Sequence, residues 1–267
     1  MSDLGGPTPP DLPGAAPPWP SDDGPPPLPD GATESEPAAL PPVPWHWLES
    51  FAVFMLTFVT AGLLAVVVAA AFSGDLEKAM AVVVFEVALA GWALLWPKIR
   101  FGLGPRALGL RRDQMGGDIR YGLGIGVVGW VVSTLVVGNV VVRLVERITD
   151  GPVTEPDQLN YSDPSGLVLT ITAIGVIVIA PIAEEIFFRG FVFRGFRRDV
   201  GFVIAAVASS ILFMFAHLPF WIIFPSIFTL GLFLSRALEK RASLIPCIVA
   251  HALFNSAGFA AYMITLN

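Results

Sequence analysis

The chain has 267 residues, of which 54% are hydrophobic and only 14% are charged. Since an ordinary soluble domain carries about 25% charged residues, this composition excludes a soluble globule and predicts an integral membrane protein. The net charge of −6 arises in residues 1–44, which contain seven acidic residues and no Lys or Arg, whereas the rest of the chain has 16 basic and 15 acidic residues. This balance gives no reason to expect a nucleic-acid partner, whereas the apolar composition predicts contact with the lipid bilayer.

Residues 1–44 contain 15 of the 24 prolines, together with acidic residues and glycines, and almost no apolar residues that could pack. This composition predicts a disordered, partly polyproline II tail that acts as a spacer or as a docking site for a proline-binding partner. The tail lacks the basic and apolar regions of a signal peptide, so we expect the first membrane segment to be a retained anchor. Residues 45–267 are predicted to form a transmembrane helical domain.

Apolar stretches long enough to cross a hydrocarbon layer of roughly 30 Å recur after the tail, separated by short charged turns. The pattern predicts an all-α fold, a polytopic transmembrane helix bundle of about seven spans. The expected spans are Trp47–Phe72, Ala79–Trp96, Tyr121–Val145, Gly166–Phe196, Phe202–Leu218, Phe220–Leu238 and Leu244–Ile264.

Lys and Arg collect in the connections after the second, fourth and sixth expected spans, which lie on one side of a seven-span bundle. The positive-inside rule makes this side cytoplasmic. We therefore expect a cytoplasmic N-terminus, in a protein of the plasma membrane. The opposite connections are rich in acidic residues, with Arg143 and Arg147 as exceptions. Trp45, Trp47, Trp92 and Trp96 flank span ends and fit an interfacial belt.

The fourth expected span contains two carboxylates and a guanidinium, at Glu184, Glu185 and Arg189. Each unpaired charge at mid-membrane costs at least about 2.5 to 3.5 kcal/mol, so the presence of these charged residues in an apolar span needs an explanation. Glu185 and Arg189 are four residues apart and can neutralise each other on one helix face. Glu184 lies about 100° round the helix and has no partner there, which makes it the candidate general base.

Three further polar residues lie in later spans, His217, His251 and Asn255. At 1.5 Å per residue from the basic turn between the fourth and fifth spans, Glu184 and His217 lie about 21 Å and 24 Å into the membrane. His251 and Asn255 lie about 12 Å and 18 Å beyond the basic turn that precedes the last span, in the same half of the bilayer. Three helices are therefore expected to bring these groups to one buried layer.

A carboxylate and two imidazoles in a low-dielectric cavity can bind a Zn²⁺ ion that activates water, with Glu184, His217 and His251 as ligands, or can activate water directly. The sequence leaves both versions open. In either version the amide of Asn255 is placed to stabilise an oxyanion. The rival classes are an ion-coupled or proton-coupled transporter and a non-catalytic scaffold of the same fold. Clustering at one depth favours the hydrolase over a transport path.

Two other patterns are interpreted as packing. Gly122 and Gly126 form a small-xxx-small motif that is typical of close helix contact. Cys247 lies four residues before His251 and formally permits a thiol nucleophile, but a membrane-buried cysteine is usually a small packing residue. The sequence contains neither His-Glu-x-x-His nor Gly-x-Ser-x-Gly, so a conventional zinc protease and a serine nucleophile elbow are not expected.

The motifs Glu-Glu-x-x-x-Arg at 184–189, Phe-x-x-x-His at 213–217 and His-x-x-x-Asn at 251–255 resemble, in this order, the CPBP (Abi) family of intramembrane proteases, which includes the type II CAAX prenyl endopeptidases. The resemblance covers residues 165–260, and the basic segment Leu108–Arg112 also fits it. It implies an endopeptidase in which Glu184 activates water, both histidines and Asn255 surround the scissile carbonyl, and Glu185 and Arg189 give support. The implied substrate is a membrane-associated peptide or protein, prenylated in one version.

Overall fold

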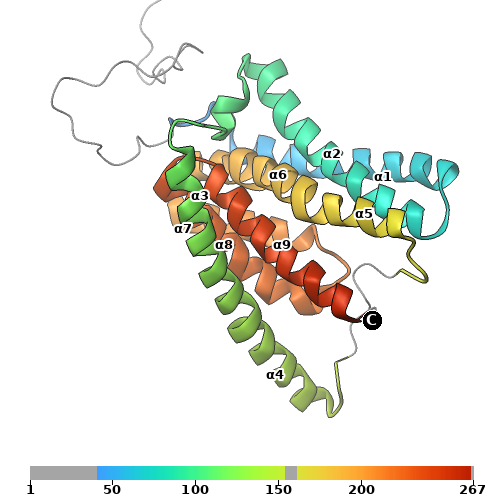
Figure 1. Cartoon of the computed structure of the whole chain (residues 1–267). Helices are drawn as coiled ribbons and strands as arrows, with labels where there is room; N and C mark the ends of the chain where they lie inside the picture. Colours follow the sequence, from blue (N-terminus) through green and yellow to red (C-terminus); the bar gives the residue numbers. More distant parts are fainter. Residues whose placement is uncertain (1–40, 154–160, 266–267) are drawn as a thin grey trace, which may run out of the picture. The chain divides into compact units, whose positions relative to one another are not determined.

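The computed structural model describes residues 41–153 and 161–265, which contain helices and no strand. The predicted all-α fold is confirmed. Residues 1–40 of the predicted tail lie outside the described residues. Figure 1 shows the arrangement of the helices. In chain order they are α1 (Trp47–Ala71), α2 (Gly74–Phe101), η1 (Pro105–Leu108), α3 (Met115–Trp130), η2 (Val131–Gly138), α4 (Asn139–Thr149), α5 (Gly166–Ile174), η3 (Gly175–Ile179), α6 (Ala180–Glu184), η4 (Glu185–Phe193), α7 (Arg194–Phe215), η5 (Trp221–Ile223), α8 (Phe224–Arg241) and α9 (Ile245–Thr265).

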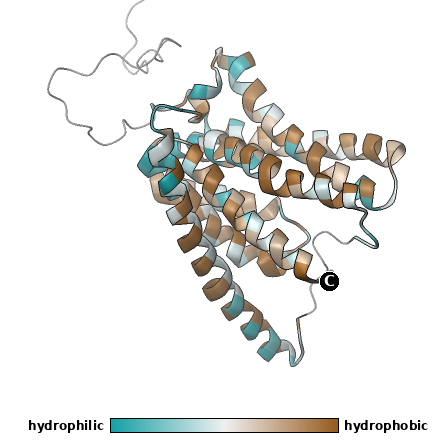
Figure 2. Ribbon diagram, in the orientation of Figure 1, coloured by the Kyte–Doolittle hydropathy of each residue, from teal (hydrophilic) through white to brown (hydrophobic). Residues whose placement is uncertain are grey.

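Six helical stretches of the described chain are long and apolar enough to cross a membrane, against the seven expected. The difference arises in the stretch Gly166–Phe215, whose 50 residues include the fourth expected span and all but the last three residues of the fifth. Figure 2 shows apolar residues along the lengths of the helices and polar residues at many of their ends. Such apolar surfaces require a lipid environment, which agrees with the integral membrane protein that the composition predicts.

The long stretch is divided at Gly201, whose φ of 78° and ψ of 173° are not helical. An L-residue with a side chain rarely adopts this φ, which explains the glycine. Beyond Gly201 the chain returns along η4, as two contacts show. The Ser209 hydroxyl donates to the carbonyl oxygen of Phe188 at 3.0 Å, and the rings of Phe188 and Phe213 lie 5.1 Å apart. The expected antiparallel pair of segments is therefore present.

The basic connections meet at one end of the bundle. Arg241, at the end of α8, forms an ion pair of 2.7 Å with Asp118 of α3, and Arg197 of α7 pairs with Glu239 of α8 at 2.8 Å. Arg194 donates to the carbonyl oxygen of Ala107 in η1, which belongs to the loop after α2. The three connections that the sequence places on one side of the membrane are thus in mutual contact.

The segment just before α1 packs against this end of the bundle. Trp45 is fully buried, and its indole nitrogen Nε1 donates to the carbonyl oxygen of Phe191 at 2.9 Å. Arg198 donates to the carbonyl oxygens of Val43 and Pro44. The expectation of an interfacial role for Trp45 is wrong, since its ring is enclosed between elements of the bundle. Residues 41–44, assigned to the tail from composition, are held by these contacts.

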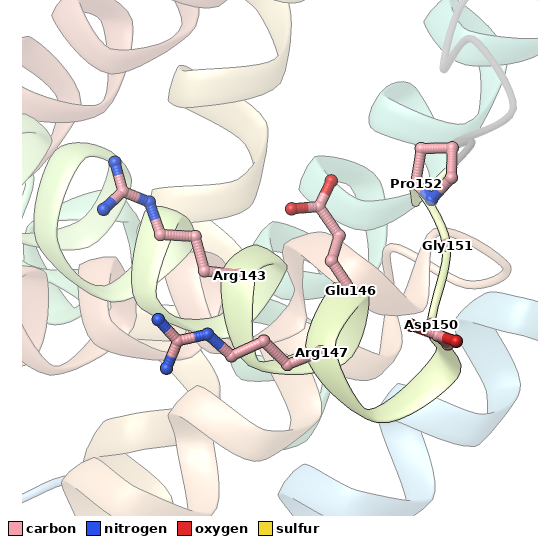
Figure 3. Close-up of a pocket in the computed structure, with 6 residues that line it drawn as sticks. All are labelled: Arg143, Glu146, Arg147, Asp150, Gly151 and Pro152. Carbon is pink, nitrogen blue, oxygen red and sulfur yellow. The ribbon is translucent and has the colours of Figure 1, made fainter.

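The segments α3, η2 and α4 form one continuous helix of 35 residues, Met115–Thr149. A span needs about 20 residues, so this helix is longer than the hydrocarbon layer requires. Its last part, α4, has no buried residue and carries Arg143 and Arg147, the two exceptions to the charge pattern. Figure 3 shows both arginines at an open pocket with Glu146, Asp150, Gly151 and Pro152. This pocket shares no residue with the predicted site.

Candidate active site

The predicted pair of Glu185 and Arg189 is formed inside η4. Arg189 donates from Nη1 to Oε1 of Glu185 at 3.1 Å, and both side chains are completely buried. The guanidinium also lies over the ring of Phe213, 4.2 Å from its centroid, so two groups compensate for its burial. The turn has π-helical geometry, which is rare and frequent at functional sites. The i, i+4 pairing expected from the sequence is confirmed.

His251, in α9, lies between the two glutamates of the motif. Its ring nitrogen Nδ1 is 2.9 Å from Oε1 of Glu185, and its Nε2 is 3.6 Å from Oε2 of Glu184. A carboxylate accepts hydrogen bonds, so Nδ1 carries a proton that it donates to Glu185. This bond sets the orientation of the ring and leaves Nε2 turned toward Glu184.

The position of α9 depends on two glycines of α3, as the small-xxx-small motif predicts. A Cβ atom on Gly122 would lie 2.8 Å from the carbonyl oxygen of Pro246, and one on Gly126 would lie 2.9 Å from Cα of Ala250. Both distances are too short for a real side chain, so the backbones touch only because these residues are glycines. Ala250 directly precedes His251, so this contact fixes the depth of the histidine.

Glu184 ends α6 and has no ion-pair partner within its own helix, as expected. It is buried, with 7% of its surface exposed, and faces two other helices. One is α9, through His251. The other is α2, which packs against α6 and carries Glu86, a buried glutamate whose Oε2 has no hydrogen-bond partner among the described residues. Glu86 was missed by the sequence reasoning, although a glutamate inside the apolar second span is itself a signal of function.

His217 follows α7 and is half-buried. Its Nδ1 donates to the carbonyl oxygen of Phe213, one turn earlier, at 2.9 Å. The Phe213 ring makes edge contacts with both imidazoles, with centroid distances of 5.0 Å to His217 and 5.6 Å to His251. Within the described chain, no hydrogen bond or ion pair joins His217 to Glu184. The two histidines therefore share Phe213 as an aromatic neighbour, but only His251 lies close to Glu184.

Asn255 lies one turn beyond His251 and donates from Nδ2 to the carbonyl oxygen of Val176 at 2.8 Å. This carbonyl needs a partner because the backbone N–H of Ala180 bonds to Gly175 instead, and Pro181 has no N–H to offer. The wide turn η3 and the proline thus create an acceptor that Asn255 satisfies. A side-chain amide has two N–H donors, so the second remains for another acceptor.

Cys247 is fully buried, and its thiol lies 3.3 Å from the carbonyl oxygen of Leu234 in α8. This contact fits the packing interpretation.

No group of three or more His, Cys, Asp or Glu side chains in residues 41–153 and 161–265 is arranged to hold a metal ion. The set expected for Zn²⁺, Glu184, His217 and His251, is not assembled as ligands. In both histidines Nδ1 is engaged, with Glu185 and with the Phe213 carbonyl, so only Nε2 of each ring could reach an ion. We therefore derive no step through a metal.

The basic segment Leu108–Arg112 rests on the same core. A Cβ atom on Gly190 of η4 would lie 2.9 Å from the carbonyl oxygen of Leu108, so the loop touches the helix backbone. The carbonyl oxygen of Gly109 accepts from the backbone N–H of Leu244, just before α9, at 2.9 Å. The loop thus connects the helix of the glutamates to the helix of His251.

Residues 166–257 match a protein family described as type II CAAX prenyl endopeptidase Rce1-like. Comparison with curated proteins and with solved structures gave no match. The matched range includes all six residues predicted for the site, whereas Glu86 lies outside it. The family implies a membrane-associated peptide substrate. The match confirms the resemblance carried by the three motifs: residues 166–257 are similar to the Rce1-like, CAAX-type endopeptidase family.

Proposed function

We propose that the chain is an intramembrane endopeptidase in which Glu184 activates water to hydrolyse a peptide bond near the membrane surface. The observation that carries this proposal is the approach of Nε2 of His251 to within 3.6 Å of Oε2 of Glu184, in a buried layer. This separation is too long for a good direct hydrogen bond, and a water molecule can contact both atoms at once. A base and an imidazole on one water molecule are what hydrolysis requires.

In the proposed reaction, Glu184 takes a proton from water while the water oxygen bonds to the carbonyl carbon of the substrate. The carbonyl oxygen becomes an oxyanion, which accepts from the second N–H of Asn255. The C–N bond then breaks, and the proton held by Glu184 passes to the leaving amine. Water supplies the new carboxyl oxygen, so atoms and charges balance without a further reactant.

Glu185 and Arg189 support this reaction without touching the substrate. Glu185 accepts the Nδ1 proton of His251 at 2.9 Å and so keeps Nε2 directed toward the water. Arg189 compensates for the buried charge of Glu185 at 3.1 Å. The pair also attaches α9 to η4, which holds the base and the imidazole at a fixed separation.

The substrate we propose is a membrane-bound peptide or protein with a prenylated CAAX terminus. The apolar helices around the site suit a lipid-modified chain, since a prenyl group partitions into hydrocarbon. We also propose that the basic end of the bundle faces the cytoplasm of a cell whose plasma membrane contains the protein. A zinc-assisted variant of the reaction, with Glu184, His217 and His251 as ligands, stays a prediction.

The test uses the purified full-length chain in lipid vesicles and a fluorogenic peptide that ends in a farnesylated CAAX sequence. Glu184→Ala should abolish cleavage, while Glu146→Ala, a change in the pocket of Figure 3, should leave it unchanged. Full activity of the Glu184→Ala protein would refute the proposal. A carrier or a non-catalytic scaffold would leave the peptide intact with the unmodified chain as well.

A further inference from the structure

A cavity of about 320 Å³ lies at the basic end of the bundle, between the segment before α1, the start of α7 and the end of α8. It shares no residue with the hydrolytic site. Its apolar lining includes Val43, Phe193 and Leu238, each with 3% or less of its surface exposed. Its charged lining consists of Arg194, Arg197, Arg198 and Glu239. The cavity therefore combines an apolar wall with a positively charged one.

The charges of the lining do not cancel. Among the described residues, three guanidinium groups face one carboxylate, and this carboxylate, Glu239, already accepts from Nε and Nη2 of Arg197 at 3.1 Å and 2.8 Å. Asp199 approaches Nε of Arg198 to 3.8 Å, but it lies outside the lining and accepts from the backbone N–H of Trp47 at 3.0 Å. The lining thus keeps an excess of positive charge.

Arg197 and Arg198 are held in place and still have donors to offer. Arg198 donates from Nη1 to the carbonyl oxygens of Val43 and Pro44, and Arg197 is held by Glu239. Within residues 41–153 and 161–265, no hydrogen bond uses Nη1 of Arg197 or Nη2 of Arg198. The two side chains are 42% and 31% exposed, so a ligand can reach these N–H groups. A guanidinium fork that is fixed in this way matches the oxygen atoms of a phosphate group.

The cavity lies at the depth of the lipid head groups. Phe196 lies between two arginines of the lining in the sequence, and its ring is 6.1 Å from that of Trp47. Trp47 has 41% of its surface exposed, and exposed tryptophans are typical of the membrane–water interface. Phe51, one turn further along α1, is 42% exposed, so lipid-facing apolar surface begins at this level. A lipid has carbon atoms that can cover the apolar wall, whereas a free phosphate ion has none.

We propose that this cavity binds the head group of an anionic membrane phospholipid. The phosphate accepts hydrogen bonds from Arg197 and Arg198, and the first carbon atoms of the lipid cover Phe193 and Leu238. Basic pockets between membrane helices bind lipid head groups in this way. The ammonium group of a zwitterionic lipid is repelled by the excess positive charge, so the cavity selects lipids with a net negative charge. The proposal does not depend on the hydrolytic reaction.

The test measures the lipids that the purified full-length chain retains in native mass spectra, with phosphatidylglycerol and phosphatidylcholine added in equal amounts to the micelles. The unmodified protein should bind one phosphatidylglycerol about tenfold more tightly than phosphatidylcholine. Arg197→Gln combined with Arg198→Gln should remove this preference. Equal affinity of the unmodified protein for the two lipids would overturn the proposal.

Arg236→Gln is the matched control for the double variant. Arg236 is exposed near the end of α8, and its guanidinium lies 6.0 Å from the ring centroid of Phe202, outside the cavity. This variant removes a positive charge near the cavity without touching its lining, so it should retain the preference for phosphatidylglycerol. An equal loss in the control and the double variant would overturn the proposal, because general attraction by surface charge would then explain the binding.

A further variant should raise the affinity. Glu239→Gln removes the one carboxylate of the described lining and keeps a carbonyl oxygen as an acceptor for Arg197. Phosphatidylglycerol should then bind about fivefold more tightly. An unchanged or weaker affinity would overturn the proposal. This result decides the question even if the double arginine variant does not fold.

Two more measurements identify the source of the phosphate. Glycerol phosphate, which has the head group without the acyl chains, should fail to displace phosphatidylglycerol at equal concentration, and displacement would overturn the assignment to a lipid. Phosphatidylglycerol should also raise the unfolding midpoint of the unmodified protein in zwitterionic micelles, because a ligand of the folded state stabilises it, and should leave the midpoint of the double arginine variant unchanged. Equal shifts in both proteins would contradict the proposed site.

Discussion

Nδ1 of His251 lies 2.9 Å from Oε1 of Glu185, although 66 residues separate the two along the chain. Both side chains are buried, so this bond joins α9 to η4 in the interior of the bundle. Arg189 completes the group at 3.1 Å from the same oxygen. The three side chains form a buried, charge-compensated unit on which the position of the imidazole depends.

Removal of one member of this unit should destabilise the fold as well as the site. Glu185→Leu leaves the Arg189 charge uncompensated, and we expect a loss of about 3 to 5 kcal/mol in the free energy of unfolding. The double variant Glu185→Leu with Arg189→Met removes both charges and should recover a large part of this loss. The check is the unfolding free energy of each protein in mixed micelles. A double variant no more stable than Glu185→Leu alone would contradict the account.

Asn255 should contribute to catalysis through the N–H that Val176 does not occupy. Asn255→Ala is expected to lower kcat about 100-fold to 1,000-fold, the usual effect of deleting an oxyanion donor. Ser256→Ala is the matched control, because the Ser256 hydroxyl bonds only to the carbonyl oxygen of Ala252 in its own helix. Steady-state kinetics with the fluorogenic peptide give both values. A similar kcat for the two variants would exclude Asn255 as the oxyanion donor.

The close contact of α3 with α9 should be intolerant of any side chain at Gly126. Gly126→Val places its Cβ 2.9 Å from Cα of Ala250, so α9 must move and carry His251 with it. We expect a destabilisation of about 1 to 3 kcal/mol together with a large loss of activity. Gly124→Ala is the control, since nothing lies within 4 Å of its Cβ position. Equal stability of Gly126→Val and Gly124→Ala would show that the helices are not in contact there.

The metal question is settled by the paired measurement of metal content and activity. If Glu184 activates water without an ion, peptide cleavage should continue at an unchanged rate after chelation and dialysis. Metal analysis of the same preparation gives the content before and after treatment. Loss of activity on chelation and its return with Zn²⁺ would instead favour the version in which Glu184, His217 and His251 bind the ion.

Much of the site could be predicted because its chemistry is local. The Glu185 and Arg189 pair follows from a spacing of four residues, and the close packing of Gly122 and Gly126 follows from the same periodicity. The common layer of Glu184 and His251 follows from counting residues along antiparallel helices. Each of these predictions needs only the geometry of a helix and the direction of the chain.

The features that could not be predicted depend on contacts between distant segments. Glu86 has no motif partner on its own helix, so its burial becomes apparent only when α2 packs against α6. The hydrogen bond from Asn255 to Val176 depends on a wide turn whose carbonyl loses its usual donor. The burial of Trp45 depends on Phe191, 146 residues later. Periodicity carries no information about these three contacts.

The most direct test of the central claim follows the oxygen atom that water donates. The full-length chain in vesicles is incubated with the farnesylated CAAX peptide in heavy-oxygen water, and the released fragments are weighed by mass spectrometry. We predict that the new carboxyl terminus carries one heavy oxygen, and that Glu184→Ala yields no such fragment. Cleavage with heavy-oxygen incorporation by the Glu184→Ala protein would contradict the assignment of Glu184 as the base that activates water.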